Sequence, residues 1–222
     1  MVRLAGNQYQ SKWLGYLYDH CFTWFYSSMV SNSYIAKRRE YYEWCDQKLP
    51  VNADGNYRCI PMLLDKLAEQ MTAAIELHSK VLFVRIDLTS INPDSGNEPM
   101  ECLLRWLKQW LRRYYNMQNI GHFWVIEKSR NKGTHWHLVL LLDGNRVQNS
   151  GLVIDRIKYR WEVLTDSGLV SIPKNCFYQI RRGDDDAFEE AFYRGSYLAK
   201  ERSKQAIKNG CTYGASKLKT RV

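Results

Sequence analysis

Val81-Leu-Phe-Val-Arg-Ile-Asp-Leu-Thr89 is the stretch that decides the fold. Its aliphatic and β-branched residues are typical of a β-strand, and the alternation of side chains along a strand puts Arg85, Asp87 and Thr89 on one face. The segments before it have helical patterns instead. A strand-forming core therefore begins at this point of the chain.

The segments that follow the strand alternate between helical and strand patterns. Two apolar strands flank a polar, Gly-containing connection, which predicts a hairpin with a basic loop. The order strand-helix-strand-strand-helix-strand-helix predicts an α+β fold, in which a mostly antiparallel central sheet carries helices on one side. The expected helices after residue 81 are 98–117, 150–164 and 184–204, and the expected strands are 122–127, 135–142 and 175–181.

The region before the strand is predicted to be helical. Residues 9–30 and 33–48 have helical patterns rich in Tyr and Trp, and Pro61 fits the first position of a helix that runs to about Ser79. With 222 residues, the chain has room for one core and an extension. We expect an N-terminal helical extension at 1–55, a catalytic domain at 56–205 and a basic C-terminal tail at 206–222.

The composition indicates a folded protein that binds a polyanion. Apolar residues make up 45% of the chain and the formal net charge is +9. The six cysteines form no CxxC pair, and the first residues lack the apolar core of a signal peptide, so we expect free thiols in a reducing cytoplasm. The longest aliphatic run, Leu138 to Leu142, is too short to span a bilayer, which argues against a membrane role.

His135-Trp136-His137 is the strongest candidate for a metal site. Within a strand, the two imidazoles share one face while Trp136 points into the opposite layer, so both histidines can bind one cation. Glu127, at the end of the preceding hairpin strand, is our first choice for a third ligand, and Asp87 is the competing one. His122 has the opposite parity to Glu127 and should face away.

Tyrosines and lysines line one face of the last predicted helix. Tyr193, Tyr197, Lys200 and Lys204 are spaced at i, i+4, i+7 and i+11. A solvated amphipathic face is the common meaning of such a stripe, but a tyrosine oxygen can also attack a phosphodiester that a divalent ion polarises. Lys200, one turn beyond Tyr197, can stabilise the charge that develops in such a reaction.

Basic residues gather in two further segments that we expect to contact DNA phosphates, although the charge of the C-terminal segment alone fits a solvated tail equally well. From Lys200 to the C-terminus, seven Lys or Arg residues stand against one Glu. The predicted DNA contacts are Arg130 and Lys132 in the hairpin loop and Lys204, Lys208, Lys217 and Lys219 towards the C-terminus.

Three segments together resemble the HUH endonucleases, which include rolling-circle replication initiators of phages, plasmids and small DNA viruses. Val84–Thr89 is similar to the first strand motif of that family, Thr134–Leu138 to its metal motif and Tyr197–Lys200 to its Tyr-x-x-Lys nucleophile motif, in the family's order. The Tyr213–Ser216 stretch resembles a C-terminal Gly-x-Ser stretch of filamentous-phage replication proteins.

This resemblance implies a fold with an RRM-like core and a defined chemistry. Tyr197 would nick DNA, His135 and His137 would bind Mg²⁺ or Mn²⁺, and Glu127 matches the third ligand. Tyr193 leaves the number of tyrosines open, because some members use two on one helix. The expected partners are single-stranded or origin DNA and, because the chain has no P-loop motif, a host helicase in the bacterial cytoplasm.

Three other functions remain open from the sequence. A non-catalytic single-strand binding module would use the aromatic residues for base stacking and would capture no DNA covalently. A metal-dependent nuclease that activates water would leave free ends. A relaxase or transposase of the same superfamily would keep the site and serve a different process.

Overall fold

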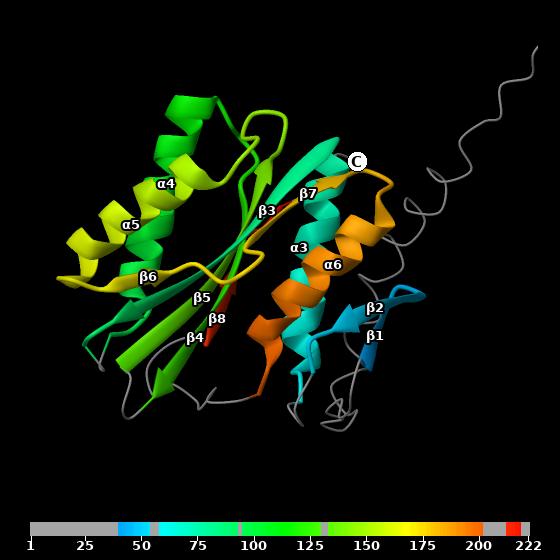
Figure 1. The fold of residues 1–222 in the computed structure, drawn as a ribbon, viewed down its shortest axis with the longest axis horizontal. Helices are drawn as coiled ribbons and strands as arrows, with labels where there is room; N and C mark the ends of the chain where they lie inside the picture. The colour runs from blue at the N-terminus through cyan, green and yellow to red at the C-terminus, as the bar shows by residue number, and fades with distance from the viewer. Residues whose placement is uncertain (1–39, 54–57, 93–94, 130–132, 202–211, 219–222) are drawn as a thin grey trace, which may run out of the picture.

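The structure, a computed structural model, describes residues 40–53, 58–92, 95–129, 133–201 and 212–218. The predicted helix at 9–30 lies outside these residues. Helices and strands alternate along most of the described chain, as Figure 1 shows. They are β1 (Glu40–Trp44), β2 (Gln47–Val51), α3 (Pro61–Leu77), β3 (Lys80–Ser90), α4 (Glu98–Tyr115), β4 (Gly121–Ser129), β5 (Gly133–Asp143), α5 (Gly151–Thr165), β6 (Leu169–Ser171), β7 (Phe177–Arg181), α6 (Asp185–Gly195), the 3₁₀ helix η2 (Ser196–Ala199) and β8 (Tyr213–Ala215).

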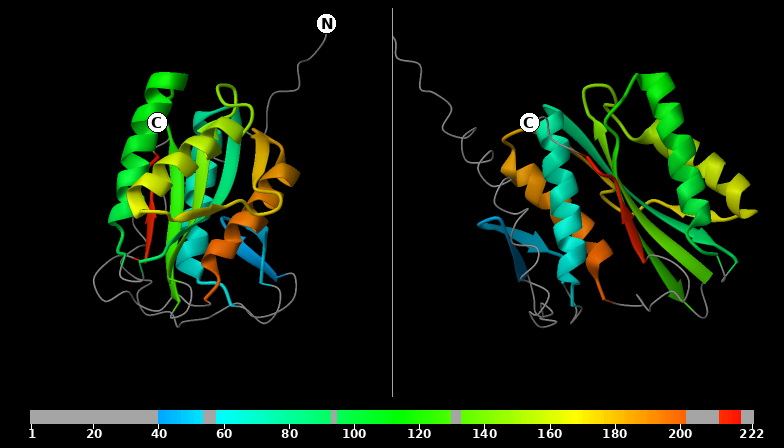
Figure 2. Two further views of the ribbon diagram at one scale, coloured as in Figure 1. Left: turned by 60° about the vertical axis from the view of Figure 1, so that its left-hand side comes forward. Right: turned by 180° about the vertical axis from the view of Figure 1, so that it is seen from behind.

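The centre of the fold is a six-stranded sheet with the order β6-β3-β5-β4-β8, in which β7 also pairs with β3. Every strand pair of this sheet is antiparallel, which confirms the predicted α+β fold. Helices cover both faces of the sheet and not one, as Figures 1 and 2 show. Among the described helices, none is both long and apolar enough to span a membrane.

Two hydrophobic cores explain why both faces carry helices. On one face, α4 and α5 bury Leu82, Ile86 and Trp136; on the other, α3 and α6 bury Phe83 and Leu141. The central strands β3 and β5 contain runs of consecutive apolar residues, so apolar side chains point to both faces of the sheet. Helices on one face alone would leave the apolar side chains of the other face in water. Trp136 packs edge to face against Trp161 of α5 with ring centroids 5.1 Å apart, as its predicted orientation requires.

The prediction of a helix over 33–48 is wrong for residues 40–48, which belong to the β1–β2 hairpin. The Tyr and Trp residues of β1 suit a strand as well as a helix. Cys45 and Asp46 join the two strands with positive φ angles of 46° and 61°, the backbone of a two-residue hairpin turn. The hairpin lies outside α3 and α6, away from the main sheet (Figure 1).

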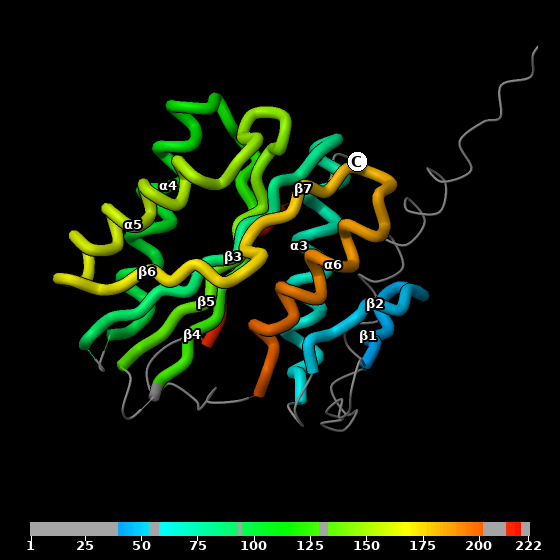
Figure 3. The backbone as a smooth tube through the Cα atoms, in the orientation of Figure 1, coloured from blue at the N-terminus to red at the C-terminus, as the bar shows by residue number. Residues whose placement is uncertain are grey.

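One edge of the sheet is interrupted beside Arg85. β6 pairs with Asp87–Thr89 of β3 and β7 pairs with Lys80–Val84, so two short strands follow the same side of β3. Figure 3 shows the chain following β3 from β6 to β7. Between them, the backbone N–H of Arg85 donates to the carbonyl of Cys176 at 2.6 Å.

The other edge is β8, which lies within the segment that was predicted to be a basic tail. It pairs with β4 at the edge of the sheet (red in the right view of Figure 2). In the register of this pair, Gly214 lies opposite Trp124. The Ser216 hydroxyl accepts a hydrogen bond from the backbone N–H of His122 at 3.0 Å and donates to Gln70 of α3. The Gly-x-Ser stretch is thus part of the sheet.

Candidate active site

The strand register brings the first two sequence motifs together on the face covered by α3 and α6. Asp87 of β3 lies opposite His137 of β5, and Thr89 lies opposite His135. On the other side of β5, Glu127 of β4 lies opposite His135. These side chains share the parity of Phe83 and Leu141, which are buried against α3 and α6.

His137 is held at both ring nitrogens. Its Nδ1–H donates to Oδ1 of Asp87 at 2.7 Å, and Nε2 lies 3.5 Å from a carboxylate oxygen of Glu127. Burial lowers the pKa of His137, but the hydrogen bonds and negative charges of Asp87 and Glu127 outweigh burial and raise that pKa above its ordinary value. Only 7% of the residue's surface is exposed.

Asp87 also forms an ion pair with Arg85. The Arg85 guanidinium donates to both carboxylate oxygens of Asp87, at 3.4 and 3.2 Å. Burial alone would raise the pKa of Asp87, yet the hydrogen bond and charge of His137, together with Arg85, hold that pKa below its ordinary value. Asp87 therefore stays ionised and orients His137 through Nδ1, as carboxylates do for metal-binding histidines.

Within the described part of the chain, only one ring nitrogen of His135 has a hydrogen-bond partner. Nδ1 lies 3.3 Å from the Thr89 hydroxyl, while Nε2 is buried with no hydrogen-bond partner among the residues that the structure describes. A buried nitrogen without a partner is costly, and a metal ion is one group that would satisfy it. The donor types present, two imidazoles and a carboxylate, fit a divalent cation.

Within the described part of the chain, however, no three His, Cys, Asp or Glu side chains are already arranged as a metal-binding group. Glu127 approaches Nε2 of His137, whereas Asp87 occupies Nδ1. Glu127 therefore approaches the ring nitrogen of His137 that does not face Asp87. Metal binding by His135, His137 and Glu127 stays a prediction.

His122 lies on the opposite face of the sheet, as its parity predicts. It is 6% exposed, and the positive charge of Lys108 in α4 acts on it. Burial, with Lys108 second, lowers the pKa of His122 to about 3. His122 is therefore a neutral, buried residue of the α4 layer and belongs to a different environment from the candidate site.

The third motif meets the first two through Tyr197. The rings of Tyr197 and His137 lie edge to face, with centroids 5.4 Å apart and an interplanar angle of 79°. Two cations flank the phenol ring: the Arg85 guanidinium carbon lies 4.1 Å from its centroid and Nζ of Lys200 lies 5.0 Å from it. Positive charges in these positions stabilise a phenolate.

The predicted continuous helix from 184 to 204 is wrong, because α6 ends at Gly195 and a 3₁₀ turn continues to Ala199. Lys200 then leaves the helix and forms a β-bridge with Cys59, and the backbone N–H of Ile60 donates to the carbonyl of Ala199. Pairing with residues 58–60 thus replaces a further helical turn. Lys204 lies outside the described residues, so its position on the predicted face is not defined.

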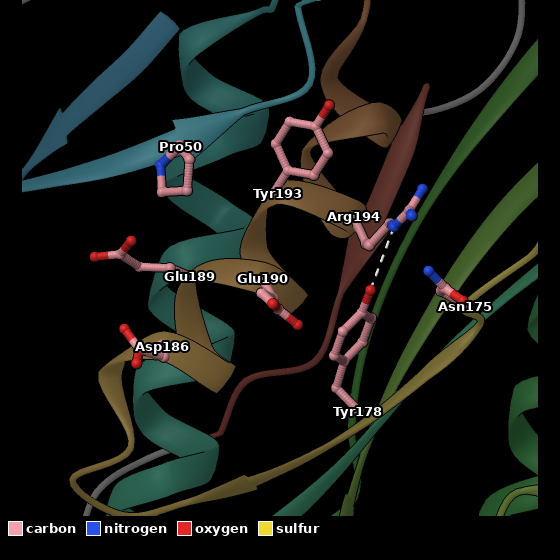
Figure 4. Close-up of a pocket in the computed structure, with 8 residues that line it drawn as sticks. All are labelled: Pro50, Asn175, Tyr178, Asp186, Glu189, Glu190, Tyr193 and Arg194. Carbon is pink, nitrogen blue, oxygen red and sulfur yellow. Dashed lines mark hydrogen bonds between the residues drawn. The ribbon is translucent and has the colours of Figure 1, made fainter. Parts of the chain in front are cut away.

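Tyr193 lines a different part of the surface. In Figure 4 it borders a hollow of about 470 Å³ that is also lined by the carboxylates of Asp186, Glu189 and Glu190. Arg194 donates to the Tyr178 hydroxyl at 3.3 Å in the same hollow. The contacts of the Tyr197 ring with Arg85 and Lys200 therefore favour Tyr197 as the candidate nucleophile.

The sequence does not predict two supporting contacts of the site. It predicts that Arg85 shares a face with Asp87, but the contact of Arg85 with Tyr197 joins segments 112 positions apart and has no local signal. The backbone N–H of Asn52, after β2, donates to Ser196 Oγ at 2.8 Å, and Ser196 Oγ in turn donates to the Tyr193 carbonyl. The N-terminal hairpin therefore supports the turn that carries Tyr197.

Of the predicted DNA contacts, Lys217 is described, and it is exposed just after β8. Arg130 and Lys132 of the hairpin loop lie outside the described residues, as do Lys204, Lys208 and Lys219.

A comparison with protein families matches residues 47–216 to the YagK/YfjJ C-terminal domain. Neither a curated protein nor a solved structure matches the chain. The matched range runs from the start of β2 to the residue after β8, and it contains every residue of the candidate site. Because it covers most of the sequence, the chain belongs to the YagK/YfjJ C-terminal domain family.

Proposed function

We propose that this chain is a metal-dependent endonuclease of the HUH kind, which nicks and rejoins single-stranded DNA through a covalent phosphotyrosine and initiates rolling-circle replication. The observation that carries the proposal is the contact between Tyr197 and His137, 5.4 Å from ring centroid to ring centroid. Through it, the three segments that resemble HUH motifs meet on one face of the sheet.

Tyr197 is the nucleophile in this proposal. Its phenolic oxygen attacks the phosphorus, forms a phosphotyrosine ester and breaks the bond to the 3′ oxygen, which takes up a proton and leaves as a 3′-hydroxyl. The reverse reaction rejoins the strand. Arg85 and Lys200, whose charges lie against the phenol ring, stabilise the phenolate and the scissile phosphate.

His135, His137 and Glu127 would hold a divalent cation, Mg²⁺ or Mn²⁺. When bound, the cation would polarise the scissile phosphate. The chain's own contribution is to fix the ligands: Asp87 orients His137 through Nδ1, and Thr89 does the same for His135. The buried Nε2 of His135, which has no hydrogen-bond partner among the described residues, supports this assignment.

The test is covalent capture of DNA. A labelled library of random-sequence single strands is incubated with the full chain and Mn²⁺, and denaturing gels separate protein–DNA adducts from free strands. We expect adducts with the unaltered chain and with Tyr193→Phe, but none with Tyr197→Phe or when EDTA replaces Mn²⁺. Sequencing of the captured strands then identifies the preferred nick site.

The other outcomes each contradict a defined part of the proposal. Loss of the adduct in Tyr193→Phe alone would assign the nucleophile to Tyr193. Free ends without any adduct would indicate a nuclease that activates water. Binding without cleavage, at all metal concentrations, would indicate a single-strand binding module.

A further inference from the structure

Three aromatic rings are stacked along α4, on the face of the sheet opposite the candidate active site. Trp106, Trp110 and Tyr114 are four residues apart and therefore lie along one side of the helix. The first two rings are 6.5 Å apart at 8°, and the next two are 5.3 Å apart at 17°. These near-parallel planes form a continuous ladder.

Arginines of α5 lie over this ladder. The guanidinium carbon of Arg156 is 5.8 Å from the Trp110 ring, and that of Arg160 is 5.7 Å from the Trp106 ring. Nε of Arg160 is buried and has no hydrogen-bond partner within the described chain. The second half of α4, residues 105–115, has four basic residues and no acidic one.

Packing of α4 on the sheet accounts for the inner parts of the ladder but not for its outer end. Trp106 and Trp110 are half-buried against the core, whereas Tyr114 is 61% exposed and ends the stack. Arg112 and Arg113, beside it on the helix, are exposed as well. An open aromatic ring flanked by exposed cations matches the two parts of a nucleotide, a flat base and an anionic phosphate.

We propose that this α4–α5 surface, formed by Trp106, Trp110, Tyr114, Arg113, Arg156 and Arg160, binds single-stranded DNA. An unpaired base continues the stack on Tyr114, and Arg113 contacts the adjacent phosphate. The occupant is single-stranded because the bases of a duplex already stack on one another and cannot add to a protein ring. Positive charge on this surface and the net charge of +9 suit a polyanion.

This inference extends the proposed function with a second DNA contact, remote from the nicking chemistry. Such a contact would hold the strand on the protein while Tyr197 is engaged. It can be tested without the reaction, because binding needs neither the nucleophile nor the metal.

The test measures fluorescence anisotropy of labelled 15-nucleotide single strands with the full chain carrying Tyr197→Phe, in EDTA. Adding Tyr114→Ala should weaken binding about tenfold, the loss of one base stack. The matched control is Tyr159→Ala on α5, since Tyr159 is 65% exposed and belongs to none of the described aromatic stacks. It should bind within about twofold of the parent. Arg113→Ala should lower the slope of log K against log salt by about 0.7.

A duplex made by annealing the same strand to its full complement is the second probe, and Tyr114→Ala should leave its affinity within about twofold. The proposal is overturned if single-strand affinity is unchanged in Tyr114→Ala, or if the duplex loses as much affinity as the single strand. Circular dichroism of Tyr114→Ala confirms that the fold is kept. Adduct formation by the chain with Tyr197 and Mn²⁺ reports separately on the proposed function.

Discussion

The Arg85 guanidinium lies 4.1 Å above the ring of Tyr197 while it donates to Asp87 at 3.2 Å. One side chain thus connects the candidate nucleophile to the carboxylate that orients His137. Arg85 is 7% exposed, so its charge acts in a setting where water screens it weakly.

Replacing Arg85 should therefore slow nicking more than it reduces DNA binding. For Arg85→Gln we expect a rate of adduct formation about 100-fold lower at saturating DNA, because a cation that stabilises the phenolate and phosphate is lost. Arg85→Lys should form the adduct at a rate between those of Arg85→Gln and the unaltered chain, because lysine keeps the charge but loses the flat contact with the Tyr197 ring. Single-turnover gels at several DNA concentrations measure the rate and the affinity separately.

The control for Arg85 is a basic residue away from the site. Lys48 is exposed on β2, and Lys48→Gln removes the same charge from the protein. If both variants slow adduct formation equally, the effect belongs to net charge and not to the position of Arg85.

Asp87→Asn should weaken metal binding by about 10- to 100-fold, the usual cost of losing a carboxylate behind a metal-binding histidine. The change leaves a side chain of the same size against Nδ1 of His137 at 2.7 Å but removes its charge. Titration calorimetry with Mn²⁺ measures the effect directly.

Asp143→Asn serves as the control, because Asp143 also lies near a histidine, 3.7 Å from His78, but outside the candidate site. Its Mn²⁺ affinity should match that of the unaltered chain. Equal Mn²⁺ affinity in Asp87→Asn and the unaltered chain would contradict the role that we assign to Asp87.

The core strands were predictable because their apolar residues are contiguous and their parity is unambiguous. Trp136 and His137 could thus be assigned to opposite faces of the sheet because they are consecutive residues of one strand. The expected helix at 61–79 was confirmed within two residues of its end, since Pro61 occupies its first turn.

The remaining errors have long-range causes. The helical path through α6 and η2 stops at Ala199 because residues 58–60 pair with the chain at 199–201, which no local pattern indicates. β1 resembled a helix because its aromatic residues suit both structures, and its turn uses Cys45 and Asp46 at positive φ, where Gly and Asn are the usual signals. The geometry of the site depends on such long-range pairings, so the contacts of Arg85 above all could not be predicted from the sequence and are visible only in the fold.

Gly214 tests whether β8 belongs to the sheet in solution. A Cβ atom at this position would lie 2.6 Å from the indole of Trp124, which is buried and cannot withdraw. Gly214→Ala should lower the free energy of unfolding by about 2 kcal/mol, as overpacking does. Urea denaturation followed by circular dichroism measures the change.

The control is Gly96→Ala, because a Cβ atom there would meet nothing within 4 Å. It should leave the free energy of unfolding within about 0.5 kcal/mol of the original value. Equal stability of Gly214→Ala and Gly96→Ala would mean that β8 does not pack on Trp124 as described.

His122 makes the stability of the fold depend on pH. Burial, together with the charge of Lys108, lowers the pKa of His122 to about 3, whereas an unfolded histidine has a pKa of about 6.5. The unfolded chain therefore binds a proton first: the contribution of His122 is fully present above pH 6.5 and is lost as the pH falls from there towards 3. Between pH 7 and pH 5 this loss is about 2 kcal/mol.

His122→Gln should remove that dependence, because a glutamine binds no proton in this range. Urea denaturation gives the free energy of unfolding of both proteins at pH 7 and at pH 5. Carboxyl groups also titrate in this range, but they contribute equally to both proteins, so comparing the loss of stability in the two proteins isolates the contribution of His122. The unaltered chain should lose about 2 kcal/mol more than the variant. If both lose the same amount, His122 is not buried in its neutral form, and the packing described between the N-terminal end of β4 and α4 is wrong.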